Sequence, residues 1–207
     1  MCSYDLTQIS LGRAHSCARL TTGAARCWGA NESGQLGDGT VTARRSPVAV
    51  SGLVSGVAQV AAGGAHTCAR LATGAARCWG ANGAGQVGDG TTVNRRVPTA
   101  VSGLGAGVAQ VMAGGAHTCA RLTVGTLRCW GTNGSGQLGD GTLVARKVPV
   151  AVTGVTGAAG LALGSSHTLV RVDGTGGLRS WGRGSSGQLG TGVTATRAVA
   201  GTVVGLG

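Results

Sequence analysis

The stretch that decides the fold is residues 59–104, QVAAGGAHTCARLATGAARCWGANGAGQVGDGTTVNRRVPTAVSGL, because residues 110–155 repeat it as QVMAGGAHTCARLTVGTLRCWGTNGSGQLGDGTLVARKVPVAVTGV. Further copies lie on either side. The tryptophans that mark the four copies stand 51 residues apart, at Trp28, Trp79, Trp130 and Trp181. A period of about 50 residues is typical of propeller blades and other strand-built repeats. The chain is therefore predicted to be one array of four units, at residues 5–55, 56–106, 107–157 and 158–207.

The second copy predicts four short strands, at residues 58–62, 66–71, 76–80 and 97–101. The three-residue loop between the second and third strands ends in Gly74, which fits a hairpin with a type I turn and a left-handed glycine. Glycine stands at the same place in copies one and three while its neighbours change, as a positive φ requires. Pro98, near the start of the fourth strand, suits an edge position.

Four short antiparallel strands per copy, with no helical periodicity, predict an all-β protein built of β-propeller blades. The four blades are expected to form a partial ring, or a ring that is completed by another chain. Small apolar residues and one tryptophan per blade must fill the core. The tryptophans are therefore predicted to be packing residues and not a stacking platform for a ligand.

Six of the seven cysteines fall into pairs ten residues apart: Cys17 and Cys27, Cys68 and Cys78, and Cys119 and Cys129. Counting outward from the hairpin loop places Cys68 directly opposite Cys78, where the short Cα distance of a non-hydrogen-bonded pair suits a disulfide. The fourth copy has Leu169 and Ser180 at these positions, so both cysteines are replaced together. Buried free thiols and half of a zinc site are the alternatives.

Three disulfides would place the protein in an oxidising compartment, outside the cell or in the periplasm. The first ten residues, MCSYDLTQIS, show no signal peptide, so the chain is expected to be a fragment or a processed product. Cys2 has no predicted partner. No apolar run of 18 residues or more occurs, so no membrane insertion is expected.

Several motifs at fixed offsets resemble the repeat of the RCC1 (regulator of chromosome condensation) family: His66-Thr67, Trp79-Gly80-Ala81-Asn82, the run 85–90 and Val97-Pro98. The resemblance covers nearly the whole chain, and its cysteine-containing form is similar to the secreted bacterial branch of the family. It implies a β-propeller, usually of seven blades. The founding member is a guanine-nucleotide exchange factor for a small GTPase. That activity depends on loops and a wedge that these repeats lack.

The chain carries 17 basic and 6 acidic residues, a net charge of +11, which suits a polyanionic partner or a soluble protein that repels itself. Three basic pairs recur in the predicted loop before the fourth strand: Arg44 and Arg45, Arg95 and Arg96, and Arg146 and Lys147. They are predicted to form a repeated patch able to bind phosphate or sulfate groups. The alternative is a solvated surface, or ion pairs with nearby aspartates. Nucleic acid is disfavoured because few aromatic residues remain for base stacking.

One histidine recurs in each copy, at His15, His66, His117 and His167, and an aspartate recurs in three, at Asp38, Asp89 and Asp140. The histidines could ring a metal, but they are predicted to be structural residues that fix the local backbone by hydrogen bonds. One carboxylate per loop is too few for a calcium site, and turn formation explains the aspartates better. No nucleophile has a base beside it, so no catalytic, cofactor or metal site is expected, and the protein is predicted not to be an enzyme.

The sequence thus favours a non-catalytic propeller module for protein–protein interaction or self-assembly. Near-identical blades favour a homo-oligomer or a filament, because the interface inside the array is repeated at its free ends. Another protein is the other predicted partner. Polyanion or glycan binding through the basic pairs is one alternative function, and guanine-nucleotide exchange on a small GTPase is another.

Overall fold

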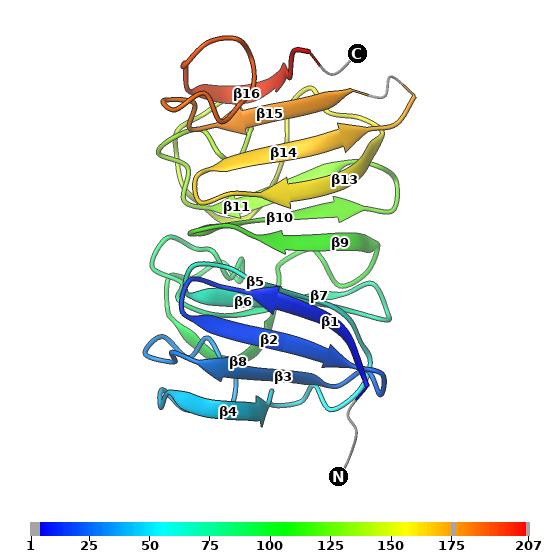
Figure 1. Cartoon of the computed structure of the whole chain (residues 1–207), viewed down its shortest axis with the longest axis vertical. Helices are drawn as coiled ribbons and strands as arrows, with labels where there is room; N and C mark the ends of the chain where they lie inside the picture. The colour runs from blue at the N-terminus through cyan, green and yellow to red at the C-terminus, as the bar shows by residue number, and fades with distance from the viewer. Residues whose placement is uncertain (1–4, 175–176, 206–207) are drawn as a thin grey trace.

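The structure, a computed structural model, describes residues 5–174 and 177–205, so Cys2 lies outside the described residues. Within these ranges the chain forms four antiparallel sheets of four strands each, which confirms the predicted all-β propeller blades (Figure 1). Blades 1 and 2 consist of β1 (Leu6–Leu11), β2 (His15–Leu20), β3 (Ala25–Gly29), β4 (Arg44–Ala49), β5 (Val57–Ala62), β6 (His66–Leu71), β7 (Ala76–Gly80) and β8 (Arg95–Ala100). Blades 3 and 4 consist of β9 (Val108–Ala113), β10 (His117–Leu122), β11 (Leu127–Gly131), β12 (Arg146–Ala151), β13 (Ala158–Leu163), β14 (His167–Val172), β15 (Leu178–Gly182) and β16 (Arg197–Thr202).

The blades are arranged as a partial propeller with the first strand of each blade on the inside. β1 lies against β5, β5 against β9, and β9 against β13. Figure 1 shows blade 1 spreading towards one end of the molecule and blade 4 towards the other, with blades 2 and 3 behind them. The described residues contain no helix long and apolar enough to span a bilayer.

The hairpin between the second and third strands has the predicted register. Cys68 pairs with Cys78 across the sheet, and the loop closes with a hydrogen bond of 2.8 Å from Leu71 N to Ala75 O. Gly74 has a φ of 80°, in the left-handed region that favours glycine. The proline-bearing strands β4, β8 and β12 are sheet edges, as expected.

The predicted start of the fourth strand is wrong by two residues. β8 begins at Arg95, which pairs with Gly80 of β7 across a β-bulge, so the basic pair opens the strand and does not lie in the preceding loop. The same holds for β4 and β12. The β-bulge explains the error. The apolar residues that indicate a strand in the sequence begin only after the bulge, whereas the pairing with the neighbouring strand begins before it.

The core consists of clusters that cross from one blade to the next. One cluster combines Leu36 of blade 1 with Val60, Ala69 and Trp79 of blade 2. Trp79, Trp130 and Trp181 are fully buried, in agreement with their predicted packing role, whereas Trp28 is only half-buried. At the inner hairpins the backbones touch directly, since a Cβ on Gly63 would lie 2.5 Å from Gly114 O.

Candidate functional site

The contact between successive blades is built on one backbone carbonyl. Gln35 O, in the long loop of blade 1, accepts a hydrogen bond of 3.0 Å from Trp79 Nε1 and one of 2.8 Å from Thr67 Oγ1, both in blade 2. Gln86 O accepts the same two bonds from Trp130 and Thr118, and Gln137 O accepts them from Trp181 and Thr168. Both lone pairs of each carbonyl are therefore used.

The loop that presents this carbonyl is held by a buried asparagine. Asn82 Oδ1 accepts from Val87 N at 2.9 Å, and its Nδ2 lies 3.0 Å from Val93 O and 3.2 Å from Asp89 Oδ1. Gly88 passes over Trp130 so closely that a Cβ would lie 2.6 Å from its Nε1. The Trp-Gly-x-Asn and Gly-Gln-x-Gly motifs are thus the two sides of one blade contact.

The three aspartates of these loops accept hydrogen bonds from a threonine and form an ion pair with an arginine. Asp89 Oδ1 lies 2.9 Å from Thr91 N, and Asp89 Oδ2 lies 2.6 Å from Arg95 Nε. Burial acts to raise the pKa of Asp89, but the bonds from Thr91, Arg95 and Asn82 outweigh it and lower the pKa. Asp38 and Asp140 have the same environment.

The structure therefore divides each predicted basic pair. Its first member forms an ion pair with the loop aspartate: Arg44 with Asp38, Arg95 with Asp89, and Arg146 with Asp140. Its second member is exposed on the edge strand, at Arg45, Arg96 and Lys147. Three of the six predicted cations are therefore neutralised within their blades, which leaves one exposed cation in each basic pair.

The histidines join neighbouring blades. His66 Nε2 lies 2.9 Å from Thr118 Oγ1 of blade 3, and His15 and His117 make the same contact with Thr67 and Thr168. Since the threonine hydroxyl gives its hydrogen to a glutamine carbonyl, it accepts from the histidine, so Nε2 carries the proton. The predicted local backbone role is wrong, because the partner belongs to the next blade. His167 of blade 4 is half-buried.

Burial lowers the pKa of each of these histidines. Desolvation lowers the pKa of His15 to about 4, and desolvation followed by the neighbouring histidines lowers the pKa of His66 to about 3. The pKa of His117 falls to about 3 for the same reasons. Nδ1 of all three is buried without a hydrogen-bond partner in the part of the chain that the structure describes, so a second proton there would create a charged ring with an unpaired N–H.

A row of glutamines, absent from the predicted site, clamps the inner strands together. Gln8 Oε1 accepts from Val60 N at 2.9 Å and its Nε2 donates to Val60 O at 3.0 Å. Gln110 makes the same pair of bonds to Leu161, and Gln59 Oε1 accepts from Val111 N. Their recurrence every 51 residues was the available signal, but a polar residue in an apolar strand is ambiguous without the neighbouring blade.

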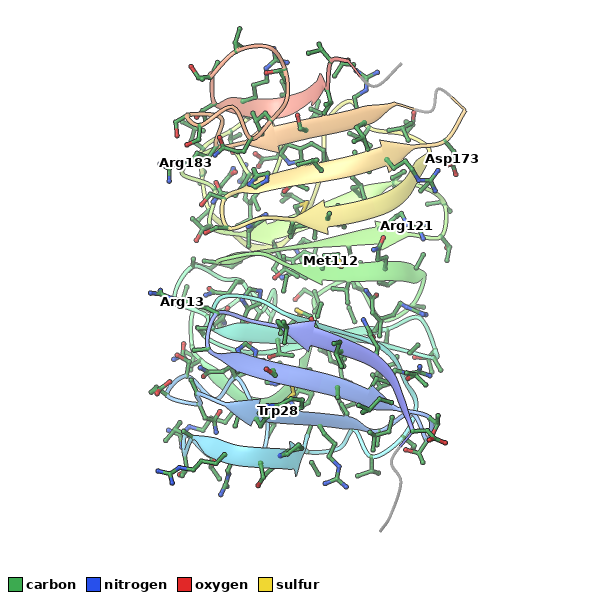
Figure 2. The ribbon with its side chains drawn as sticks, viewed as in Figure 1. Arg13, Trp28, Met112, Arg121, Asp173 and Arg183 are labelled. Carbon is green, nitrogen blue, oxygen red and sulfur yellow. A yellow bond between two sulfur atoms is a disulfide. The ribbon has the colours of Figure 1, made fainter. Side chains whose placement is uncertain are left out.

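One face of blade 1 is not covered by another blade. In blades 2 to 4 the equivalent face packs against the preceding blade. Ile9 is 65% exposed, whereas its counterparts Val60, Val111 and Leu161 are 6% exposed or less. Leu6 and Leu11 are likewise exposed. Leu6, Ala18 and Trp28 line a groove of about 420 Å³, and no described residue accepts a hydrogen bond from Trp28 Nε1. We call this surface the open face of blade 1; the half-buried Trp28 lies on it in Figure 2.

The opposite end of the array presents the complementary half of a blade contact. Blade 4 carries the loop Gly187-Gln188-Leu189-Gly190, with positive φ at both of its glycines, as in the loops that cover Trp79 and Trp130. His167 stands at the position of the bridging histidines. One part is missing, because Gly160 replaces the clamping glutamine.

Three disulfides join the second and third strands of blades 1 to 3: Cys17–Cys27, Cys68–Cys78 and Cys119–Cys129, with Cα atoms 4.1 Å apart in each. In blade 4 Leu169 and Ser180 occupy the same cross-strand pair, and Ser180 Oγ donates to Leu189 O at 2.6 Å. Blade 4 thus ties its third strand to the loop by a hydrogen bond instead.

Replacing Cys119 and Cys129 by alanine should lower the free energy of unfolding by about 2–3 kcal/mol, because the unfolded chain regains the entropy of an open short loop. Urea denaturation of the non-reduced protein measures this. Adding reductant should lower the free energy of unfolding of the parent protein further, because it breaks all three disulfides. Equal stability of parent and variant without reductant would contradict a stabilising role for this disulfide.

Residues 5–174 and 177–205 contain no cluster of three or more potential metal ligands. His15, His66 and His117 each bridge a different pair of neighbouring blades, and His167 lies at the free end of the array. The described residues present an apolar face with the tryptophan donor Trp28 Nε1 at one end of the array, and the loop of Gln188 at the other end.

A protein-family model described as "Regulator of chromosome condensation (RCC1) repeat" matches residues 23–70, 74–121 and 125–171. The chain is 34% identical over 206 residues to the human probable E3 ubiquitin-protein ligase HERC4, covering 97% of this chain and 20% of the ligase. It is 36% identical over 194 residues to human HERC3, covering 91% of this chain and 18% of that protein. The chain thus spans about a fifth of the length of these relatives.

Among solved structures, human WBSCR16 superimposes with a TM-score of 0.88 at 26% identity, over 99% of this chain and 55% of that one. Yeast RCC1 (Prp20), solved bound to Kap60, gives a TM-score of 0.85 at 21% identity, over 99% of this chain and 50% of that chain. The described blades therefore correspond to about half of each of these propellers.

Proposed function

The chain belongs to the RCC1 repeat family, and from this premise we propose that it is a non-catalytic propeller module that binds other proteins and assembles with a second copy of itself. The observation that carries the proposal is the open face of blade 1. Its apolar side chains are exposed at the positions where blades 2 to 4 bury theirs under the preceding blade.

The occupant proposed for this face is blade 4 of a second copy. Trp28 Nε1 has no acceptor among the described residues, and Gln188 of blade 4 is the counterpart of Gln35, whose carbonyl accepts from Trp79. Ser16, at the position of Thr67, would accept from His167 of the second copy. Two copies joined in this way at both ends would form a two-fold ring, with every contact of a type already present inside the chain.

Ile9→Asp should convert an assembled protein into a monomer. Ile9 is exposed in the single chain, so the substitution leaves its fold intact but buries a charge in the proposed contact. We expect the dissociation constant to rise about 100-fold. Native mass spectrometry across a dilution series measures it.

Val124→Asp is the matched control, because Val124 is 76% exposed at a hairpin loop away from the open face. It should leave the assembly unchanged. A parent protein that stays monomeric at high concentration would overturn self-assembly. The open face of blade 1 would then be covered by another chain segment or by another protein.

The three disulfides support a location in an oxidising compartment, outside the cell or in the periplasm, as for secreted bacterial repeats. Polyanion binding by the basic pairs has less support, because three of the six cations form ion pairs with aspartates. Ubiquitin ligation belongs to relatives of which this chain spans about a fifth, and it is not part of the proposal. No described feature favours nucleotide exchange over simple protein binding.

A further inference from the structure

A second set of arginines recurs in the array, on the strand next to the innermost one. Arg19, Arg70 and Arg121 stand at equivalent positions of β2, β6 and β10, each opposite a clamping glutamine. Together with Gln8, Gln59 and Gln110 they line a hollow of about 350 Å³ at the start of the inner strands. We call this hollow the arginine mouth.

The other end of the inner strands is chemically different. It opens into a hollow of about 610 Å³ lined mostly by glycine and alanine at the inner hairpins, with Arg13 as its charged residue. Figure 2 shows Arg13 on one side of the molecule and Arg121 on the opposite side. Three arginines of the second strands therefore line the hollow at one end of the inner strands, and one arginine lines the hollow at the other end.

Two of the arginines in this mouth have no partner among the described residues. Nε of Arg70 and Nε of Arg121 are buried and make no hydrogen bond. Arg19, by contrast, donates to Thr7 Oγ1 and Val57 O. A buried N–H without a hydrogen bond is unfavourable, so a bound acceptor at this place would be strongly favoured.

Among residues 5–174 and 177–205, no carboxylate lines the arginine mouth. Asp173 lies in the neighbouring hollow with Arg121 and forms an ion pair with Arg171 at 2.7 Å. Gln59 adds a further donor, since its Nε2 contacts only Met112 Sδ, a weak acceptor, at 3.7 Å. Guanidinium groups that lack a carboxylate partner match the forked geometry of a tetrahedral oxyanion.

We propose that the arginine mouth binds a small free phosphate-type oxyanion between Arg70 and Arg121, with Gln59 as an additional donor. This site is separate from the basic pairs of the edge strands, whose first members already have aspartate partners. It is also separate from the open face of blade 1, so it does not depend on self-assembly.

Titration calorimetry with inorganic phosphate and with pyrophosphate, at low and constant ionic strength, tests the proposal. The double variant Arg70→Gln and Arg121→Gln should bind at least tenfold more weakly than the parent. The matched control, Arg45→Gln with Arg96→Gln, removes the same charge from exposed positions of the edge strands and should change the affinity less than twofold.

Thermal unfolding provides the second measurement. Phosphate should raise the melting temperature of the parent and of the control, but not that of the Arg70 and Arg121 double variant. The variant itself should fold, because it loses two unpaired buried donors. Absence of phosphate binding by the parent, or an equal loss in both double variants, would overturn the assignment.

Discussion

Acidification from pH 7 to pH 4.5 is expected to remove most of the stability of the folded protein. His15, His66 and His117 are buried between blades, with folded-state pKa values of about 4, 3 and 3. In the unfolded chain they take up protons around pH 6.5, their ordinary value. Below that pH the unfolded state binds more protons than the folded state, so stability falls as the pH falls.

The size of the effect follows from proton linkage. Each histidine that titrates only in the unfolded state contributes about 1.4 kcal/mol per pH unit, or about 4 kcal/mol per unit for the three. The loss begins near pH 6.5 and is halted only near the folded-state values. Single domains have about 5–15 kcal/mol of stability, so unfolding near pH 4.5–5 is expected. The lowered pKa values of the loop aspartates extend the loss below that window.

Urea midpoints measured from pH 8 to pH 4.5 test this prediction. We expect the midpoint to stay constant above pH 7 and to fall steeply below pH 6.5. His117→Gln retains a donor for Thr168 but does not titrate, so it should lower stability at pH 7 and reduce the acid slope by about a third. An unchanged slope in this variant would show that other groups cause the acid sensitivity.

Asn82→Asp is expected to destabilise blade 2 by about 3–5 kcal/mol although it changes the side chain's volume very little. Asn82 is fully buried, and its Nδ2 donates towards Asp89 Oδ1, Thr91 O and Val93 O. A carboxylate would replace this donor by an acceptor facing three acceptors. It would also stand beside the negative charge of Asp89, so the long loop would lose its anchor.

Asn94→Asp is the matched control in the same loop. Asn94 is exposed, and only its Oδ1 is used, as an acceptor from Asn82 N at 2.9 Å. A carboxylate keeps that acceptor, so the change should be within about 0.5 kcal/mol. Urea denaturation of both variants at pH 7.5 measures the difference. Equal midpoints would mean that the Asn82 amide does not hold the loop.

Contacts within one blade could be predicted from the sequence, because hairpin register follows from counting residues outward from a loop. This gave the pairing of Cys68 with Cys78 and the positive φ of Gly74. The burial of Trp79 also followed, since a chain with so few aromatic residues needs each one for its core.

Contacts between blades could not be predicted, because they depend on how far each sheet is rotated from the last. His66 meets a threonine 52 residues further along the chain, and Gln8 meets Val60 across a similar interval. For the same reason, the sequence does not predict that the arginines opposite the clamping glutamines lie together. Their proximity to one another exists only when the inner strands lie side by side, whereas Arg95 and Arg96 are adjacent in the sequence itself.

The two-sided blade contact has a consequence for how such a chain can change length. Every internal blade carries the tryptophan and threonine donors on one face and the glutamine carbonyl on the other, so a duplicated 51-residue segment brings both halves of its own joints. Gain or loss of a whole repeat therefore keeps every contact between neighbouring blades, whereas a partial duplication would leave one contact incomplete. A copy of blade 4 would be an exception, because Gly160 offers no clamp to the strand that would follow it.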